Sequence, residues 1–412
     1  MDVDVLVVGA GPAGSTVAHR LASRGRHVVV VEEHARVGLP VQCAGLVSRR
    51  ALDLAGSTSM VRLTVRGASV YGPSLGSVSF KADEPRAFVI DRSGLDIYLA
   101  DRAARAGAEF RTSHRFDRLL RTEEGRSVVQ LRGPDGDPLE VRARLVVGAD
   151  GVTSAVARAY RLRRPVEILP AFEAEFPRSP GDAETVEVYL GRSLSPGLFG
   201  WWIPDGQGGA RVGVAVDADG TPARTYFDRL VRHLERRFGV RLQSPTAFLV
   251  SGIPIGRVPR THAAGVLLVG DAAAQVKPLS GGGIFTGMRC AEIAAEVAHE
   301  AFARDDLGAT SLAEYDRRWR EEFGEEFRRA LYLRRVFARL DDPDLDRLIA
   351  ALQGSELAAT IVAFGDIDFP THVARQLLRQ SPSLVRLLPK ALGAWVSSGS
   401  GYAPDLEFDR RK

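Results

Sequence analysis

The hydrophobic residues near the N-terminus form two short β-branched runs with an amphipathic segment between them. Val3–Val8 and Val28–Val31 are almost wholly apolar, which is typical of strands buried on both faces of a parallel sheet. Between the runs, Val17, Ala18 and Leu21 recur at helical spacing and define one apolar face. This pattern predicts a strand–helix–strand unit with parallel strands at the start of the chain.

A period of two residues governs the middle of the chain. Short runs rich in β-branched and aromatic residues predict an antiparallel sheet. A helix with apolar side chains on one face is expected over 223–238, and the chain after about residue 305 is expected to be helical. The four runs of the expected sheet cover 172–176, 185–190, 199–203 and 211–216.

A glycine-rich turn, G-A-G-P-A-G at 9–14, joins the first predicted strand to its helix. Gly9 allows a tight turn, Gly11 lets a pyrophosphate approach backbone N–H groups, and Gly14 lets helix and strand pack closely. Glu32 ends the second strand, where a carboxylate can accept hydrogen bonds from ribose hydroxyls. The turn therefore predicts a dinucleotide site, with a ligand-free glycine turn as the alternative.

Two later segments favour FAD over NAD. Each is a buried strand that ends in glycine and aspartate, L-V-V-G-A-D at 145–150 and L-L-V-G-D-A at 267–272. The second continues as P-L-S-G-G-G-I at 278–284, and its glycines open a helix expected from Ile284 to about Ala303. The N-terminus of that helix would direct N–H groups and its positive dipole end at the flavin, stabilising the anionic reduced form.

These motifs resemble, in order and spacing, the flavoprotein family of p-hydroxybenzoate hydroxylase and geranylgeranyl reductase. The resemblance implies that Asp150 shapes the pyrophosphate region, that Asp271 binds the flavin chain, and that Arg92 lies against FAD. The alternatives are that both aspartates only form turns and that Arg92 is a surface residue near a helix expected over Asp96–Ala106. The cofactor-binding residues expected on this basis are Gly9, Gly11, Ala13, Gly14, Glu32, Cys43, Ala44, Arg92, Asp150, Asp271, Gly282, Gly283 and Ile284.

The expected fold is α/β, with a Rossmann-type FAD-binding domain like that of p-hydroxybenzoate hydroxylase, an antiparallel-sheet substrate domain and a helical C-terminal region. The sequence order makes the FAD-binding domain discontinuous. The expected divisions are 1–65, 88–165 and 260–335 for the FAD-binding domain, 66–87 and 166–259 for the sheet domain, and 336–412 for the helical region.

Two segments resemble the geranylgeranyl reductase branch of this family. The first is P-V-Q-C at 40–43, where Cys43 and Ala44 match FAD-contacting positions. The branch often has an acid two residues after the cysteine, whereas this chain has Gly45, which puts the contact made by Leu46 in doubt. The second is F-G-W-W-I-P at 199–204, close to the branch pattern Y-x-W-x-F-P.

The second segment also provides a candidate substrate wall. Phe199, Trp201 and Ile203 alternate along a strand, so they share one face and would suit an isoprenoid chain. The alternative is ordinary core packing of a sheet.

The resemblance implies reduction of carbon–carbon double bonds in a polyprenyl lipid or quinone side chain. Reduced flavin would give the hydride, and Cys43, a tyrosine or an ordered water would give the proton. Cys43 could instead be a small buried side chain. NAD(P)H is the expected electron donor, bound transiently because no second G-x-G-x-x-G occurs, and a ferredoxin-like donor is the alternative.

Other functions fit the same fold. An O₂-using aromatic hydroxylase or halogenase is the first rival, because halogenases carry W-x-W-x-I-P at the place of residues 199–204. Halogenases also need a lysine near the cavity, and Lys81, the early candidate, lies in an expected exposed turn. The second rival is a flavin-bound lipid carrier without enzymatic activity.

Composition narrows the possible partners and the cellular setting of the protein. The net charge of +4 comes without a block of basic residues, which argues against nucleic acid as a partner. Two cysteines, Cys43 and Cys290, offer neither a disulfide framework nor a metal site, so a reducing cytoplasm is the simplest setting. No run of 18 apolar residues predicts a membrane span. Leucines and arginines over 377–395 indicate either peripheral membrane contact or a helical cap, and the oligomeric state stays open.

Overall fold

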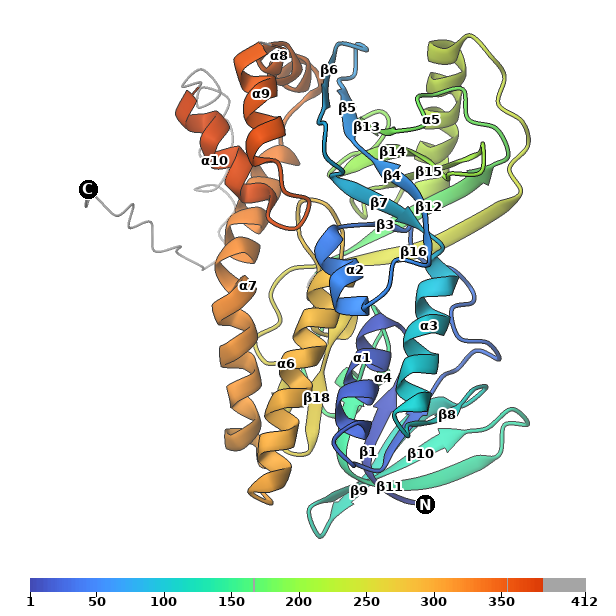
Figure 1. The fold of residues 1–412 in the computed structure, drawn as a ribbon, viewed down its shortest axis with the longest axis vertical. Coiled ribbons are helices and arrows are strands. Elements are labelled where there is room, and N and C mark those ends of the chain that lie inside the picture. Colours follow the sequence, from blue (N-terminus) through green and yellow to red (C-terminus); the bar gives the residue numbers. More distant parts are fainter. Residues whose placement is uncertain (166, 354, 381–412) are drawn as a thin grey trace, which may run out of the picture.

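The structure is a computed structural model that describes residues 1–165, 167–353 and 355–380. The part of the predicted helical region beyond residue 380, with its leucines, lies outside the described residues. The described chain forms an elongated molecule, with a mainly parallel sheet at one end and a larger mixed sheet at the other (Figure 1).

The predicted strand–helix–strand unit is confirmed. Strand β1 (Asp2–Val8) lies between β2 (Val28–Val31) and β11 (Pro138–Gly148), and all three are parallel. All four residues of β2 are buried, because helices cover one face of the sheet and a strand meander covers part of the other. The same sheet also contains β8 (Glu109–Arg111), β9 (Arg115–Glu123), β10 (Arg126–Arg132), β17 (His262–Ala263) and β18 (Val266–Leu268).

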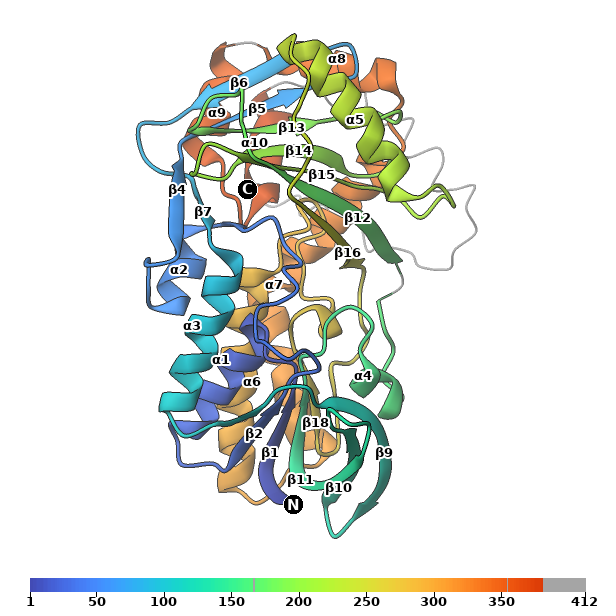
Figure 2. The same ribbon diagram turned by 90° about the vertical axis from the view of Figure 1, so that its right-hand side faces the viewer.

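Helices α1, α3 and α6 pack together beside the parallel sheet (Figure 2). The long α7 then runs along α6 toward the second sheet, where α8, α9 and α10 gather beside its edge (Figure 1). The helix bounds are α1 (Pro12–Ala22), α2 (Arg49–Ala55), α3 (Arg92–Arg105), α4 (Ala155–Ala159), α6 (Ile284–Ala303), α7 (Ala309–Phe337), α8 (Asp342–Leu352), α9 (Ser355–Phe364) and α10 (Pro370–Gln380), with the short 3₁₀ turn η1 at Gly270–Ala273.

The second sheet has one apolar face covered by α5 (Ala223–Phe238) and an opposite face turned toward the first sheet (Figure 2). Four of its strands match the predicted runs, and β5 and β6 from the 66–87 segment join them. Its strands, in spatial order, are β16 (Ala247–Ile255), β12 (Glu167–Phe176), β15 (Ala210–Ala215), β14 (Phe199–Pro204), β13 (Thr185–Tyr189), β5 (Gly67–Tyr71) and β6 (Ser77–Lys81).

This sheet differs from the prediction at one pair. Strand β13 runs parallel to β5, with Val186 opposite Ala68, whereas the other neighbouring strands of this sheet pair antiparallel. The pair is parallel because the hairpin of β5 and β6 enters from a distant part of the chain, and such a pairing has no local sequence signal. A small sheet of β3 (Leu46–Val47), β7 (Ala87–Ile90) and β4 (Val61–Val65) lies between the two large ones.

Some predicted boundaries are wrong. Helix α3 begins at Arg92 rather than Asp96, because the Asp91 carboxylate accepts the N–H of Gly94 and caps the helix. Lys81 ends strand β6 rather than occupying a turn. Pro343 and Pro370 lie in the first turns of α8 and α10, where a missing N–H costs no hydrogen bond.

Candidate active site

A cavity of about 620 Å³ lies where the carboxyl ends of the parallel strands meet strand β16 of the second sheet. Ligands of open α/β sheets bind at this edge. The glycine turn and the end of β2 line one end of the cavity. The 38–43 segment, the start of α3, the turn after β11 and the segment before α6 line the rest.

The three glycines of the first turn differ in the space around them. A Cβ on Gly9, at φ +101°, would lie 2.4 Å from the carbonyl oxygen of Ala149, and a Cβ on Gly14 would lie 2.0 Å from the carbonyl oxygen of Gly9. Both glycines therefore serve close backbone packing. A Cβ on Gly11 meets nothing within 4 Å, so Gly11 leaves free space in the cavity wall.

Glu32 joins this turn to the end of β2. Its Oε2 accepts the N–H of Ala10 at 3.0 Å, and its Oε1 accepts the N–H of His34 at 3.0 Å and contacts His34 Nδ1 at 2.6 Å. The carboxylate lines the cavity with lone pairs left for a hydroxyl donor. His34 was missed in the sequence analysis. The only indication of its role was that a polar residue follows Glu32 by two positions.

Arg92 lies at the centre of a buried group in the middle of the cavity wall. Its guanidinium forms an ion pair with Asp96 and lies beside Cys43. The Arg92 Nε atom is buried and has no hydrogen-bond partner among the described residues. Burial raises the pKa of Asp96, and it raises the pKa of Asp271 to about 6 against the opposing charge of Arg92. An unpartnered donor beside two aspartates suits a polar ligand that completes the group.

Asp150 forms the turn that starts α4. Its carboxylate accepts hydrogen bonds from the Ser154 hydroxyl at 2.7 Å and from the N–H groups of Ala155 at 2.7 Å and Val156 at 3.0 Å. Burial raises the pKa of Asp150 despite these donors. Asp150 also lines the cavity, so it shapes the wall through the turn, and direct contact with a cofactor stays a prediction.

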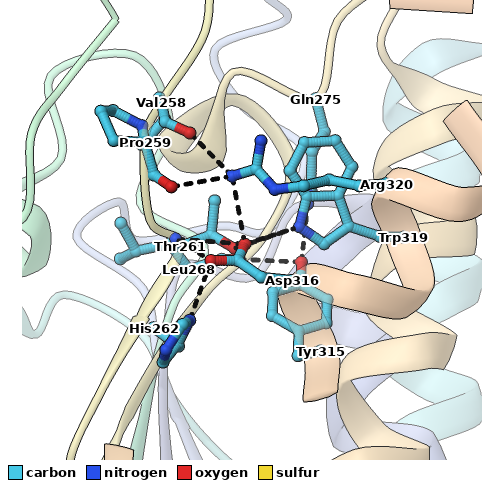
Figure 3. Close-up of polar contacts among 10 residues, drawn as sticks. All are labelled: Val258, Pro259, Thr261, His262, Leu268, Gln275, Tyr315, Asp316, Trp319 and Arg320. Carbon is cyan, nitrogen blue, oxygen red and sulfur yellow. Dashed lines mark hydrogen bonds and ion pairs between the residues drawn. The ribbon is translucent and has the colours of Figure 1, made fainter. Parts of the chain in front are cut away.

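The strand end that carries Asp271 is supported from behind by α7 (Figure 3). The N–H of Gly270 donates to the side chain of Gln275 at 2.8 Å, and Gln275 donates to the Tyr315 hydroxyl at 2.7 Å. The Tyr315 hydroxyl in turn donates to the carbonyl of Leu268 at 3.0 Å. These buried contacts fix the backbone of the β18–η1 turn, and so they position Asp271.

Asp316, the next residue on α7, holds the start of the neighbouring strand β17 (Figure 3). It accepts hydrogen bonds from the Thr261 side chain and N–H, contacts His262 Nδ1 at 2.9 Å and accepts from Trp319 Nε1 at 2.9 Å. Burial alone would raise the pKa of Asp316, but the His262 and Thr261 hydrogen bonds outweigh it and lower the pKa to about 2. The residue therefore stays ionised and structural.

Most of the predicted cofactor residues meet at this one cavity. Three do not line it: Gly14 packs against the carbonyl of Gly9, the carbonyl of Ala44 accepts from Arg211 Nη1 at 2.6 Å, and Gly282 faces Lys277, since a Cβ there would lie 2.9 Å from the Lys277 Cε. The predicted residues that line the cavity are Gly9, Gly11, Ala13, Glu32, Cys43, Arg92, Asp150, Asp271, Gly283 and Ile284.

The predicted substrate wall lies one layer further back. Phe199, Trp201 and Ile203 share the face of β14 that is turned away from α5, as the alternation predicts. Trp201 packs with the apolar cluster that contains Ile253 and Val276, and these two residues line the cavity. Contact of this wall with a substrate stays a prediction.

Comparison with known proteins gives one family and a set of close relatives. The model of the FAD binding domain family matches residues 2–297. The digeranylgeranylglycerophospholipid reductase 2 of Methanothermobacter thermautotrophicus is 35% identical, over 94% of this chain and 99% of that protein. The reductase of the same name from Methanopyrus kandleri is 34% identical, over 94% and 98%.

Solved structures agree with this similarity. A geranylgeranyl bacteriochlorophyll reductase-like protein from Thermoplasma acidophilum has a TM-score of 0.84 and 25% identity, covering 95% of this chain and 99% of that one. A myxobacterial chondrochloren halogenase has a TM-score of 0.66 and 22% identity over 80% of this chain and 82% of that one, which shows a shared fold alone.

Among the described residues, no helix is long and apolar enough to span a membrane.

Proposed function

The chain belongs to the FAD binding domain family of flavoproteins, and from this premise we propose that it saturates carbon–carbon double bonds in the polyprenyl chains of a geranylgeranyl-type lipid. It is an FAD-dependent oxidoreductase of the geranylgeranyl reductase type. One observation carries the proposal: a chain similar over nearly its whole length to a digeranylgeranylglycerophospholipid reductase has a cavity fit for FAD whose lining includes Cys43 and the apolar residues Ile253 and Val276.

The residues of the cavity fit FAD. The open wall at Gly11 leaves room for a pyrophosphate, the free lone pairs of Glu32 suit ribose hydroxyls, and the unpartnered Nε of Arg92 needs an acceptor. Asp271 would hold a hydroxyl of the ribityl chain, as the family resemblance implies. FAD bound here would supply the hydride once it is reduced.

The protein's own contribution is orientation, charge and the proton. The N-terminus of α6, at Gly283 and Ile284, turns backbone N–H groups and a positive dipole end toward the cavity, which favours negative charge there. Of the proton sources suggested by the sequence, Cys43 lines the cavity, and its Sγ accepts the N–H of Gly45 at 3.4 Å. The apolar face beyond it would exclude water from a prenyl chain.

We further propose NAD(P)H as the electron donor. The described chain supplies one glycine-rich dinucleotide turn, which the FAD would occupy, so a nicotinamide would bind only transiently at the open side of the cavity. A ferredoxin-like protein is the alternative donor. A lipid substrate also implies peripheral contact with a membrane surface.

A halogenase is disfavoured by the place of Lys81. This lysine lies at the end of β6, half exposed, and its Nζ is 2.9 Å from Glu184 and 3.7 Å from Asp182. It therefore belongs to a surface ion-pair group rather than to the cavity wall. The similarity to halogenases is one of fold alone.

The test is anaerobic reduction of a prenyl lipid. Purified protein with FAD, a chemical or NAD(P)H reductant and a digeranylgeranyl glycerophospholipid should yield lipid that is heavier by two hydrogen atoms for each double bond reduced. The fully saturated lipid is the matched control and should leave the reduced flavin unchanged. Product formation that requires O₂, or flavin reduction with no change in the lipid, would contradict the proposal.

A further inference from the structure

A second hollow, of about 610 Å³, lies away from the cofactor cavity, at the C-terminal end of α5. Four arginines line it: Arg229, Arg232 and Arg236 on α5, and Arg241 in the segment that follows the helix. Helix α5 covers the outer face of the second sheet (Figure 2), and all four arginines are exposed. The hollow is therefore open to solvent and separate from the cavity described above.

The positive charge of this hollow is not neutralised. Its lining has one carboxylate, Glu235, whose Oε1 already accepts the N–H of Leu242 at 3.1 Å. Arg229 donates to the carbonyl of Ser193 at 3.3 Å. The other three arginines have neither an ion pair nor a hydrogen bond within the part of the chain that the structure describes. Four arginines and one glutamate give the lining a formal charge of +3.

The stability of α5 does not account for these arginines. Like charges three and four residues apart on a helix repel, as at Arg229 and Arg232 and at Arg232 and Arg236. The negative end of the helix dipole stabilises Arg236 in the last turn, but this effect falls off within one turn and does not reach Arg229 or Arg232. Guanidinium groups bind phosphate through paired hydrogen bonds. A phosphate group is therefore the ligand chemistry that fits the hollow.

The segment that follows the hollow combines basic and exposed apolar residues. Residues 236–270 contain five arginines and no aspartate or glutamate, although the whole chain has 51 acidic residues. At the start of β16, Phe248 is 54% exposed and Val250 is 70% exposed. The guanidinium of Arg224, at the start of α5, lies 5.5 Å from the centre of the Phe248 ring. Basic residues beside exposed apolar side chains are typical of surfaces that bind anionic membranes.

Strand β16 connects this surface to the cofactor cavity. It is the last strand at one edge of its sheet, and its residues Ser251 and Ile253 line the cavity. Residues that alternate along a strand point to opposite faces, so Phe248 and Val250 lie on the face turned away from Ser251 and Ile253. In Figure 1, α5 and the segment that leads to β16 form one edge of the molecule, and Figure 2 faces that edge. One strand thus separates the exposed apolar residues from the cavity.

We propose that this surface, the α5–β16 face, docks the protein on a bilayer that contains anionic phospholipids, an inference that rests on the proposed function. The α5–β16 face consists of the arginine hollow together with Phe248 and Val250. A lipid phosphate occupies the hollow, and the two apolar side chains insert among the headgroups. A polyprenyl lipid then passes from the bilayer around β16 into the cavity without exposing its chains to water.

The decisive variant is Arg232→Gln with Arg236→Gln. Both side chains are exposed and have no partner among the described residues, so the fold and the cavity should be unaffected. The matched control is Arg328→Gln with Arg329→Gln on α7. It removes the same charge from two arginines that pair with Glu325, on the other side of the molecule in Figure 1. Melting temperature and FAD content are measured for both double variants.

Binding is measured by sedimentation of the holoprotein with vesicles of phosphatidylglycerol and phosphatidylcholine. The wild type should bind these vesicles, bind vesicles of phosphatidylcholine alone more weakly, and be released as the salt concentration rises. Each basic residue near an anionic surface contributes about fivefold to the binding constant, so the Arg232 and Arg236 variant should bind roughly 25-fold more weakly. The control should bind like the wild type.

A second measurement locates the inserted surface. Phe248→Trp places an indole on the α5–β16 face, and its emission should be quenched when the vesicles carry brominated acyl chains. The control is Leu120→Trp on β9, an exposed position on the other sheet, which should add no quenching beyond that of the native tryptophans. Equal quenching of the two variants would overturn the proposed face.

Other occupants of the face give different results. Inorganic phosphate that releases the protein from vesicles at low millimolar concentration, where salt of equal ionic strength does not, would assign the hollow to a soluble anion. A dimer that Phe248→Ala dissociates, together with no binding to anionic vesicles, would assign the edge of β16 to a second copy of the chain. Either result overturns membrane docking, as does wild-type binding by the Arg232 and Arg236 variant or equal loss of binding in the α7 control.

The docking face and the proposed function fail in different ways. A polyprenyl lipid dispersed in detergent needs no bilayer, so the Arg232 and Arg236 variant should reduce it at the wild-type rate but reduce the same lipid in anionic vesicles more slowly. Wild-type protein that reduces no lipid even in detergent overturns the proposed function, while vesicle sedimentation still tests the face. Wild-type protein that reduces lipid in detergent but does not bind anionic vesicles overturns the docking face alone.

Discussion

The glycine-rich turn can be dissected by adding one methyl group at two positions. Gly14→Ala and Gly11→Ala make the same chemical change three residues apart, at the N-terminal end of α1. At Gly14 the new Cβ would lie 2.0 Å from the carbonyl oxygen of Gly9 and 3.1 Å from the Ala149 side chain. At Gly11 it would meet nothing within 4 Å. We therefore expect one variant to damage the fold and the other to damage cofactor binding.

The magnitudes follow from these environments. Overpacking against rigid backbone at Gly14 should cost about 1–3 kcal/mol or more of the free energy of unfolding. Gly11 has φ −69° and ψ −176°, which alanine adopts readily. The loss of glycine at an N-cap and the gain from a less flexible unfolded chain roughly cancel, to within about 1 kcal/mol. A methyl group between the N–H groups and the pyrophosphate should cost one charged hydrogen bond, about 1.5–3 kcal/mol, or roughly 10- to 100-fold in the Kd for FAD.

Urea denaturation of the apoprotein and fluorescence titration with FAD measure the two effects separately. Gly14→Ala should lower the urea midpoint of unfolding. Gly11→Ala should leave that midpoint unchanged but weaken the binding of FAD. Gly76→Ala is the control, since its Cβ would lie 3.9 Å from its nearest neighbour, Ile349, away from the cavity. A Gly11→Ala variant that binds FAD like the wild type, or a Gly14→Ala apoprotein as stable as the wild type, would refute the reasoning.

Three further substitutions test the supports of the site. Glu32→Gln should raise the Kd for FAD by roughly 10- to 100-fold in a titration, because a charged hydrogen bond of about 1.5–3 kcal/mol is lost. An unchanged Kd would show that Glu32 does not bind the ribose. Asp316→Asn should cost about 2 kcal/mol of unfolding free energy at pH 7. The folded pKa of Asp316 is about 2, below its value of 3.8 when unfolded, so this stability is present above about pH 4 and is lost as pH falls toward 2. Denaturation at several pH values should show that the mutant lacks this pH-dependent part of the unfolding free energy. Lys277→Met should cost less than the about 3–5 kcal/mol of a fully unpaired buried charge, because the Asp368 carboxylate loses its 2.9 Å partner but keeps Arg50 at 3.4 Å; restoration by adding Asp368→Asn would support this cause, and a wild-type melting temperature for the single mutant would exclude it.

The parts of the fold that the sequence predicts are those specified by short-range patterns. Helix α6 starts at Ile284, directly after three glycines, and α5 covers residues 223–238 as its apolar spacing indicates. Each of these signals lies within a few residues of its effect. The predicted start of α3 at Asp96 was wrong although a local signal was present. Asp91 is a standard N-cap residue, and its position before Gly94 could have indicated a helix that starts four residues earlier.

The supports of the site depend on contacts between distant segments and leave no such signal. Arg211 bonds to Ala44 across 167 residues, and Lys277 bonds to Asp368 across 91. An arginine in a predicted strand or a lysine in a predicted loop would ordinarily be assigned to the surface. Arg211 is held by the carbonyls of Ala44 and Ile90, and Lys277 is held by Ile367 and Asp368 in the loop between α9 and α10.

Glu173 and Glu175 show most sharply where sequence reasoning ends. The two acids occupy alternate positions of one strand, so the pattern assigns both to the same face and gives them the same chemistry. In the structure one is 3% exposed and bonded to Trp201, while the side chain of the other is 50% exposed and faces Arg211. The difference arises because Gly213 lets the Trp201 ring cross β15 and cover the first acid but not the second. The burial of Glu173 is therefore a property of three neighbouring strands together, and no pattern within β12 alone indicates it.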